Sequence, residues 1–221
     1  MARTVTEKTA APQDVEIVVG HRRLPGVLHI PSQALGTVIF AHGSGSGRFS
    51  PRNQFVARVL QEARIATLLL DLLEEEEADD RKKVFDIRLL AERLDAAADW
   101  VIRRPELGTL KLGYFGASTG AGAALVAATR RPQRIDAIVS RGGRPDLAGN
   151  ALEVVRAPTL LIVGGDDEVV LELNQQAASR LTCLHKIVVV PGATHLFEEP
   201  GTLEEVARLA ADWFGKHFQV R

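Results

Sequence analysis

The chain has 221 residues with 27 basic and 28 acidic side chains, which leaves a formal net charge of −1. This near balance excludes a general electrostatic attraction for nucleic acid or for an anionic membrane surface. A chain of this length forms one α/β domain with a large buried sheet more readily than two domains. Its hydrophobic share of 46% is typical of a folded globular protein and not of a disordered one.

The cysteine content and the N-terminal segment indicate the cellular compartment in which the protein is expected. Cys183 is the only cysteine, so an internal disulfide and a thiolate zinc cluster are both excluded. Residues 1–13 are polar, no apolar core of signal-peptide length follows them, and no apolar run approaches the roughly 20 residues needed to span a bilayer. We therefore expect a cytoplasmic monomer or homodimer without membrane or nucleic-acid partners. Its flexible leader covers residues 1–13 and its single domain covers residues 14–221.

Short apolar runs alternate with longer helical patterns along the chain, which predicts parallel strands joined by crossover helices. The beginning differs, because two strands linked by a turn near Gly20 indicate an antiparallel hairpin. We predict a mostly parallel eight-stranded sheet with helices on both faces, an α/β fold. The predicted strands cover 15–19, 27–30, 37–41, 65–70, 111–115, 137–140, 159–163 and 186–190, and the predicted helices cover 55–63, 85–103, 121–129, 175–181 and 203–218.

One connection limits the shape of the pocket. Between the strands at 137–140 and 159–163 the chain offers only residues 141–158, too few for a helical cap domain. We therefore expect an uncapped, shallow pocket that is open to solvent.

A serine stands between two glycines where an apolar strand meets an alanine-rich helix. Ser118 is flanked by Gly116 and Gly120, the pattern of a nucleophile elbow. A serine in such a sharp turn takes strained backbone angles, and its neighbours two positions away must be small so that strand and helix can approach. The amide of Thr119, at the helix start, would point to where an oxyanion forms.

Later strand ends supply the groups that such a serine needs. Asp166 and Asp167 follow the seventh predicted strand and His195 follows the eighth, which is the order of serine, acid and histidine in hydrolases with a nucleophile elbow. His195 would accept the proton of Ser118, and a carboxylate would orient the imidazole. Asp167 is the first choice and Asp166 the second. Adjacent side chains point in different directions, so one aspartate can face the histidine while the other caps or orders the loop. A solvated pair of turn aspartates, and a loop histidine packed on Phe197, remain the alternatives.

The third predicted strand ends in His42 and a glycine-rich loop, residues 43–47. We expect His42 to shape this loop rather than to act as a second base, and the amide of Ser44 to be the second oxyanion donor. The loop, followed by Asp71 at the next strand end, also imitates a dinucleotide-binding fingerprint. Its spacing is G-x-G-x-G rather than G-x-G-x-x-G, which counts against a nucleotide site.

Charged groups at other strand ends complete the candidate site. Arg141 and Arg144 follow the sixth predicted strand, where a guanidinium could bind a substrate carboxylate. The alternative is an ion pair between these arginines and the acidic run at residues 74–77. We expect that run to be a solvated approach to a helix, with negative charge at its start, rather than a metal site.

Four motifs, at residues 42–45, 116–120, 164–167 and 192–195, together resemble those of the α/β-hydrolase superfamily. The resemblance spans nearly the whole chain, and the small uncapped domain is similar to the dienelactone-hydrolase-like branch. In that superfamily the acid follows a strand glycine in a G-x-x-D pattern, so the resemblance implies that Asp167 is the acid. Dienelactone hydrolase itself uses a cysteine nucleophile, whereas this elbow holds Ser118.

The resemblance implies a serine hydrolase that cleaves small carboxylic esters or lactones through an acyl-enzyme, with no metal and no cofactor. Ser118, His195 and Asp167 would form the triad, and the amides of Ser44 and Thr119 would form the oxyanion hole. A binding protein that keeps the fold but lacks turnover is the alternative from another class.

Overall fold

The computed structural model describes residues 11–219, in which eight strands form one sheet in the order β1-β2-β4-β3-β5-β6-β7-β8. Strands β3 to β8 run parallel, while β2 pairs antiparallel with both β1 and β4. This is the predicted mostly parallel sheet with an N-terminal hairpin. The strands are β1 (Gln13–Val19), β2 (Arg22–His29), β3 (Gly36–Ala41), β4 (Ile65–Leu70), β5 (Lys111–Ala117), β6 (Ala137–Arg141), β7 (Thr159–Gly164) and β8 (His185–Val190).

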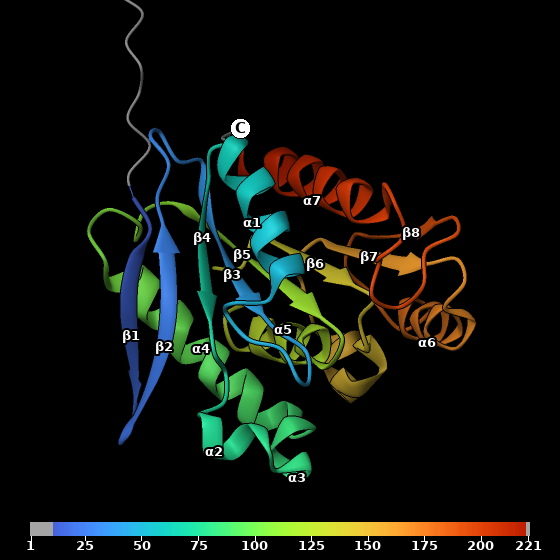
Figure 1. Cartoon of the computed structure of the whole chain (residues 1–221), viewed down its shortest axis with the longest axis horizontal. Helices are drawn as coiled ribbons and strands as arrows, with labels where there is room; N and C mark the ends of the chain where they lie inside the picture. Colours follow the sequence, from blue (N-terminus) through green and yellow to red (C-terminus); the bar gives the residue numbers. More distant parts are fainter. Residues whose placement is uncertain (1–10, 220–221) are drawn as a thin grey trace, which may run out of the picture.

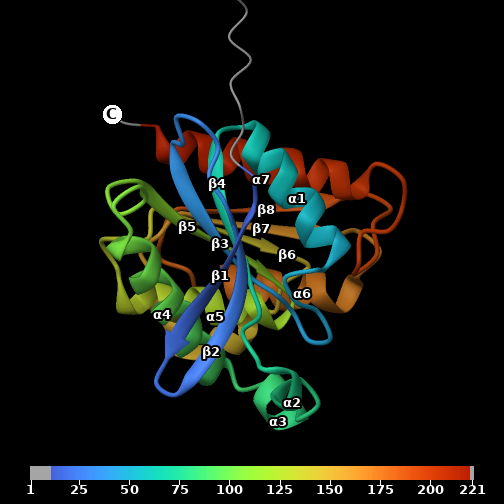
Figure 2. The same cartoon turned by 60° about the vertical axis from the view of Figure 1, so that its left-hand side comes forward.

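Helices cover both faces of the sheet, as Figures 1 and 2 show. Helices α1 and α7 pack together on one face, and α4, α5 and α6 cover the other. Tyr114 and Phe115 of β5 illustrate the two cores, because these neighbours are fully buried on opposite sides of the sheet. The helices are α1 (Pro51–Glu62), α2 (Glu75–Ala78), α3 (Arg81–Val84), α4 (Ile87–Arg103), α5 (Thr119–Arg130), α6 (Glu168–Ala178) and α7 (Thr202–Phe218).

Several boundaries differ from the prediction for physical reasons. Strand β2 runs from Arg22 through Pro25, although proline normally interrupts a strand; Pro25 lies opposite Glu16 in the register with β1. The predicted helix at 85–103 is α4, which begins at Ile87 with Asp86 as its N-cap. The two short helices before it, α2 and α3, were not predicted, because four residues are too few to show a helical period.

The ends and connections set the limits of the domain. Residues 1–10 of the predicted leader lie outside the described residues, and Gln13, placed in the leader by the prediction, belongs to β1. Between β6 and β7 the chain forms only a short 3-10 segment (Pro145–Glu153), so there is no cap domain in this connection. None of the described helices is both long enough and apolar enough to cross a membrane.

Candidate active site

Ser118 occupies the strained turn between β5 and α5. Its backbone angles are φ 49° and ψ −123°, a conformation that residues with a side chain rarely adopt. A Cβ added to Gly116 would lie 2.5 Å from the Cα of Ala121, and one added to Gly120 would lie 2.1 Å from the carbonyl oxygen of Ala41. Neither position tolerates a side chain without a backbone shift, so the two glycines let strand, turn and helix approach closely.

The structure brings His195 and Asp167 together. The Nδ1 atom of His195 lies 2.7 Å from Oδ2 of Asp167, and the two side chains are 40% and 14% exposed. A proton on Nδ1 that is donated to the carboxylate leaves Nε2 free to accept another proton. Asp166 is exposed, and its amide donates to the carbonyl of Ala193 at 3.0 Å. The two aspartates therefore point differently, and Asp167 is the one that meets the histidine.

Close backbone contact joins the loops after β7 and β8. A Cβ on Gly164 would lie 2.3 Å from the carbonyl oxygen of Ala193, so only glycine fits here. Phe197 anchors the histidine loop: its side chain is 1% exposed, although its backbone has φ 55°, and its amide donates to Thr194. The histidine is thus held by a buried anchor two residues away, and its imidazole is bonded to Asp167 rather than free in the loop.

Ser118 and His195 lie at the same edge of the sheet. Arg141, at the end of β6, accepts a hydrogen bond from the amide of Ser118 at 3.4 Å. The next residue, Gly142, packs on the histidine, since a Cβ there would lie 3.7 Å from Nδ1 of His195. Within the described part of the chain no hydrogen bond joins the Ser118 hydroxyl to His195.

The glycine-rich loop after β3 packs directly on the serine. A Cβ on Gly43 would lie 2.8 Å from the Cβ of Ser118. His42 is buried; its Nδ1 lies 2.9 Å from the carbonyl oxygen of Gly43, and its Nε2 accepts the amide of Leu72 at 2.8 Å. Burial lowers the pKa of His42, which agrees with a neutral ring that accepts this hydrogen bond. Both ring nitrogens are engaged by backbone groups, so His42 shapes the loop.

The two residues predicted to supply the oxyanion donors lie on the two segments next to Ser118. Thr119 is the first residue of α5 and is buried, while Ser44 is exposed on the loop that contacts Ser118 through Gly43. Both residues line the cavity described below.

Asp71, which the nucleotide interpretation would assign to a ribose, is engaged elsewhere. Its carboxylate accepts the backbone amide of Arg48 at 2.6 Å and forms an ion pair with the Arg48 guanidinium. A Cβ on Gly47 would lie 2.6 Å from Oδ1 of Asp71. The carboxylate therefore fastens the glycine-rich loop to the end of β4, which counts against a nucleotide site.

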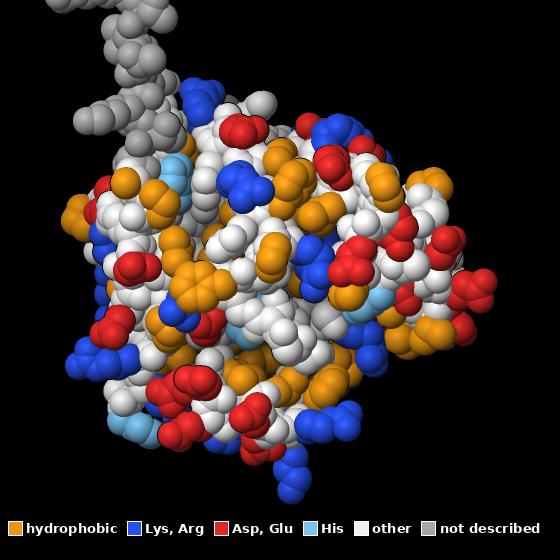
Figure 3. Space-filling model, in the orientation of Figure 1, with side chains coloured by type: hydrophobic (Ala, Val, Ile, Leu, Met, Phe, Trp, Pro, Cys, Tyr) orange, Lys and Arg blue, Asp and Glu red, His pale blue; other side chains and the backbone are white. Residues whose placement is uncertain are grey.

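A cavity of about 860 Å³ opens beside this loop. Figure 3 shows the surrounding face, with acidic side chains gathered over α2 at the bottom of the view, basic side chains beside them over α3, and apolar side chains in the hollow above. Glu75 and Ala78 of α2 and Val84 of α3 form one wall of this cavity, and the sequence did not predict this wall. The lining of the cavity includes the apolar residues Pro25, Phe49, Leu73, Ala78, Val84 and Leu90.

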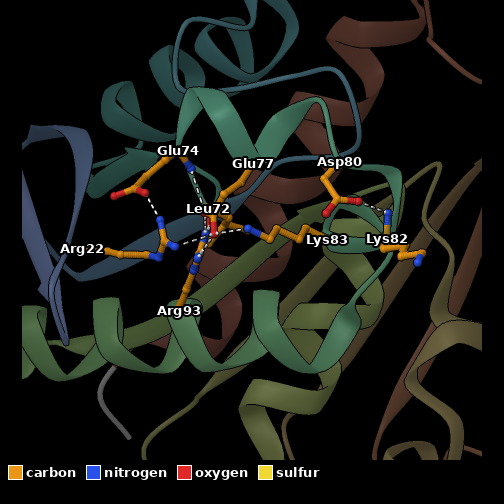
Figure 4. A network of polar contacts seen from close by, with 8 residues as sticks. All are labelled: Arg22, Leu72, Glu74, Glu77, Asp80, Lys82, Lys83 and Arg93. Atoms are coloured by element: carbon orange, nitrogen blue, oxygen red, sulfur yellow. Dashed lines mark hydrogen bonds and ion pairs between the residues drawn. The ribbon is translucent and has the colours of Figure 1, made fainter.

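A buried ion pair fixes that wall. Glu77 of α2 and Arg93 of α4 are each 3% exposed, and Figure 4 shows Arg22 and Lys83 converging on the same carboxylate. The hydrogen bond from Arg93 is the main reason that the pKa of Glu77 falls to about 2. The expectation of a solvated acidic run is therefore wrong at Glu77. Its charge is neutralised by Arg93 of α4, which lies 16 residues further along the chain. The other members of the run, Glu74 to Glu76, remain near the surface.

The arginines after β6 do not pair with the acidic run. Arg144 forms its ion pair with Asp146 at 2.7 Å. Arg141 is buried, and its Nη2 donates to Oδ1 of Asn53 in α1 at 3.3 Å. Burial, with Arg52 nearby, lowers the pKa of Arg141 to about 10, so the guanidinium stays charged at neutral pH. The alternative of an ion pair to residues 74–77 is thus wrong for both arginines.

Comparison with known proteins shows the family of the chain. Residues 57–219 match the model of the dienelactone hydrolase family. A dienelactone hydrolase from Anabaena variabilis is 55% identical, with a TM-score of 0.90 over 94% of this chain and 99% of its own. Est1E from Butyrivibrio proteoclasticus is 16% identical, with a TM-score of 0.79 over 92% and 98% of the two chains, and shares the fold.

A relative with a different name is similar in sequence. A Mycobacterium tuberculosis protein named "putative phosphoribosyl transferase" is 58% identical over 205 residues, which are 93% of this chain and 46% of that protein. The chain thus spans about half the length of the curated relatives it matches. On the family match and the Anabaena structure together, the chain belongs to the dienelactone hydrolase family and has the α/β-hydrolase fold.

Proposed function

We propose that this hydrolase cleaves small carboxylic esters or lactones through an acyl-enzyme on Ser118. The observation that carries the proposal is the hydrogen bond between His195 and Asp167, located at the same sheet edge as the strained Ser118. A serine hydroxyl is a weak nucleophile near neutral pH and needs an oriented base of this kind.

The reaction follows from these positions. Ser118 Oγ attacks the carbonyl carbon while His195 Nε2 takes its proton, after the two side chains come into contact with bound substrate. Asp167 holds the imidazole by Nδ1 and stabilises its positive charge. The amides of Ser44 and Thr119 donate to the developing oxyanion. The protonated His195 then gives its proton to the leaving alcohol oxygen.

Water completes the cycle. His195 removes a proton from a water molecule, whose oxygen attacks the acyl carbon, and the ester bond to Ser118 Oγ breaks as the proton returns to the serine. The free acid and the alcohol are the products. In a lactone the two products remain one molecule, a hydroxy acid.

The phosphoribosyl transferase name of the mycobacterial relative points to a different reaction. That name belongs to a whole protein of which the matched region is 46%. We propose hydrolysis rather than phosphoribosyl transfer for the shared region, since the oriented histidine beside a strained serine serves acyl transfer. An assay with phosphoribosyl pyrophosphate and a nucleobase should release no pyrophosphate.

Turnover of 4-nitrophenyl acetate tests the proposal. We expect Ser118→Ala to lower kcat/KM by roughly 10³-fold or more, as removal of a triad serine does. Ser179→Ala, which removes an exposed hydroxyl at the end of α6, is the matched control and should behave as the wild type. If the wild type hydrolyses no member of a panel of short esters and lactones, the alternative of a binding protein on this fold is supported instead.

A further inference from the structure

The cavity beside the glycine-rich loop begins next to the position of an ester carbonyl at Ser118. Ser44 and Thr119, whose amides would bind the oxyanion, both line it, and so does Gly43. A Cβ on Gly43 would lie 3.6 Å from Oγ of Ser118, so this part of the lining is adjacent to the proposed nucleophile. A substrate that reacts at Ser118 can therefore extend one of its groups into the cavity.

A second set of lining residues is apolar and comes from other elements. Leu73 follows β4, Val84 belongs to α3 and Leu90 to α4, and these side chains are at most 8% exposed. Phe49 is 62% exposed, so a ligand that covers its ring removes apolar surface from water. The volume of about 860 Å³ lies within the range of pockets that bury small organic ligands. The apolar side chains in this hollow are visible in Figure 3.

The charges of the lining are largely neutralised within the protein. Each arginine that lines the cavity has a carboxylate partner, in the pairs Arg23–Glu16, Arg48–Asp71 and Arg52–Glu198. Glu74, which also lines the cavity, pairs with Arg22. Among the described residues the lining therefore offers no cation that lacks a counter-ion, and an uncharged group fits this cavity better than a charged one.

Thr119 contributes a hydroxyl group without a partner. The residue is 2% exposed, and its Oγ1 forms no hydrogen bond among the described residues. A buried hydroxyl in this state costs free energy, and an oxygen atom of a ligand can supply the missing hydrogen bond. Because the amide of the same residue would bind the oxyanion, an ester group held there has its oxygens close to this hydroxyl.

We propose that this cavity binds an uncharged apolar group of the substrate, and that the Thr119 hydroxyl donates a hydrogen bond to an oxygen of the ester group. The inference rests on the proposed hydrolase function and names its substrate class as esters with a medium-length apolar chain, such as a hexanoate ester. The chain displaces water from Leu73, Val84 and Leu90, and the hydrogen bond from Thr119 fixes the ester group beside Ser118.

Two series of esters test the cavity. The 4-nitrophenyl esters from acetate to octanoate vary the acyl chain, and the acetate esters from methanol to octanol vary the alcohol. In one of the two series we expect kcat/KM to rise about fourfold with each added methylene group until the chain has about six carbon atoms, since one buried methylene contributes roughly that factor. The series that shows the rise identifies the side of the ester that occupies the cavity.

Ala78→Phe narrows the cavity without changing a buried position. Ala78 lines the cavity at the end of α2 and is exposed. In the responsive series we expect the ratio of kcat/KM for the six-carbon chain over the shortest chain to fall by about fivefold or more. Ala96→Phe, at a partly exposed position of α4 that does not line this cavity, is the matched control and should keep the wild-type ratio.

Thr119→Val tests the hydroxyl with a side chain of nearly the same shape. Loss of one neutral hydrogen bond to the substrate should lower kcat/KM by about three- to tenfold for every ester, whereas removal of a buried hydroxyl without a partner should raise the Tm. Thr119→Ser keeps the hydroxyl and should retain most of the turnover. Unchanged turnover in Thr119→Val, or an equal loss in Thr119→Ser, overturns the role of the hydroxyl.

Binding of N-phenyl-1-naphthylamine is a measurement that does not depend on turnover, because this neutral apolar fluorophore brightens when it leaves water. We expect a saturable rise in its fluorescence with the wild type and with Ala96→Phe. The affinity should be weaker in Ala78→Phe, since the added ring occupies part of the cavity.

The outcomes separate this inference from the proposed function. Ester hydrolysis that requires Ser118, with the same chain-length ratio and the same fluorophore affinity in Ala78→Phe as in the wild type, overturns the apolar cavity and leaves the hydrolase. Fluorophore binding that Ala78→Phe weakens, without hydrolysis of any ester, supports the apolar cavity and overturns the hydrolase. A wild type that shows no chain-length preference in either series and does not bind the fluorophore also overturns the apolar cavity.

Discussion

Arg93 of α4 holds Glu77 of α2 through two hydrogen bonds, with Nη1 at 2.5 Å from Oε2 and Nη2 at 2.9 Å from Oε1. Arg93 Nη1 also donates to the carbonyl of Leu72 at 2.6 Å, and the amide of Leu72 donates to His42, whose loop packs on Ser118. The buried pair therefore supports both the cavity wall and the loop that would carry an oxyanion donor.

Removal of the charge at Glu77 should destabilise the fold strongly. Glu77→Gln leaves the Arg93 guanidinium buried without its counter-ion, and breaking a buried pair in this way costs about 3–5 kcal/mol. Urea denaturation at pH 7 measures the free energy of unfolding. Glu92→Gln, on the exposed side of α4, is the control and should change that free energy by less than about 0.5 kcal/mol. Equal free energies of unfolding for Glu77→Gln and Glu92→Gln would show that the buried Glu77–Arg93 pair does not hold α2 in place.

The ion pair between Glu77 and Arg93 should also determine how the free energy of unfolding falls at acid pH. The pKa of Glu77 is about 2 in the folded chain, against 4.5 for the ordinary value. The unfolded chain therefore binds a proton first, and the stabilisation from Glu77 is complete above pH 4.5 and is lost as the pH falls toward 2. Over this interval the wild type should lose more stability than Glu77→Gln. If the free energy of unfolding falls equally with pH in the wild type and in Glu77→Gln, the lowered pKa of Glu77 is contradicted.

Glycine at position 120 should be irreplaceable, whereas another helical glycine should not. Gly120→Ala places a methyl group 2.1 Å from the carbonyl oxygen of Ala41, so β3 or α5 must shift and Ser118 with it. We expect loss of stability and of ester turnover. Gly215→Ala in α7 meets no atom within 4 Å and should stabilise the chain by about 0.5–1 kcal/mol, as alanine favours a helix over glycine. Thermal unfolding and turnover of both variants give the comparison.

The adjacent aspartates should differ sharply in their effect on turnover. Asp167→Asn removes the carboxylate that holds Nδ1 of His195 and favours the wrong tautomer, which costs about 10³- to 10⁴-fold in kcat for a triad. Asp166→Asn changes an exposed side chain and should cost less than about threefold. The greater loss in Asp166→Asn would overturn the choice of acid.

Much of the fold could be predicted from the sequence because its signals are local. All eight strands follow from short apolar runs, and the elbow follows from the spacing of Gly116, Ser118 and Gly120. Helix α6 begins at Glu168 rather than at 175, since valine and leucine near its start conceal the helical period. Signals of this kind locate elements better than their ends.

The features that the sequence did not reveal depend on tertiary contacts. The acidic run looked solvated because Arg93, which neutralises Glu77, lies in a separate helix. Arg141 could be placed on the active-site side, but its hydrogen-bond partner Asn53 lies 88 residues away in sequence. A charged side chain shows its partner only once the fold brings distant segments together.

Labelling with a fluorophosphonate probe tests the central claim most directly, because the probe forms a covalent bond only with an activated serine. After labelling, digestion and mass spectrometry, we predict one adduct on the peptide that contains Ser118. Labelling should be lost in Ser118→Ala and slowed in Asp167→Asn, whereas Asp166→Asn should react at the wild-type rate. An unlabelled wild type, or an adduct on a residue other than Ser118, would contradict the account.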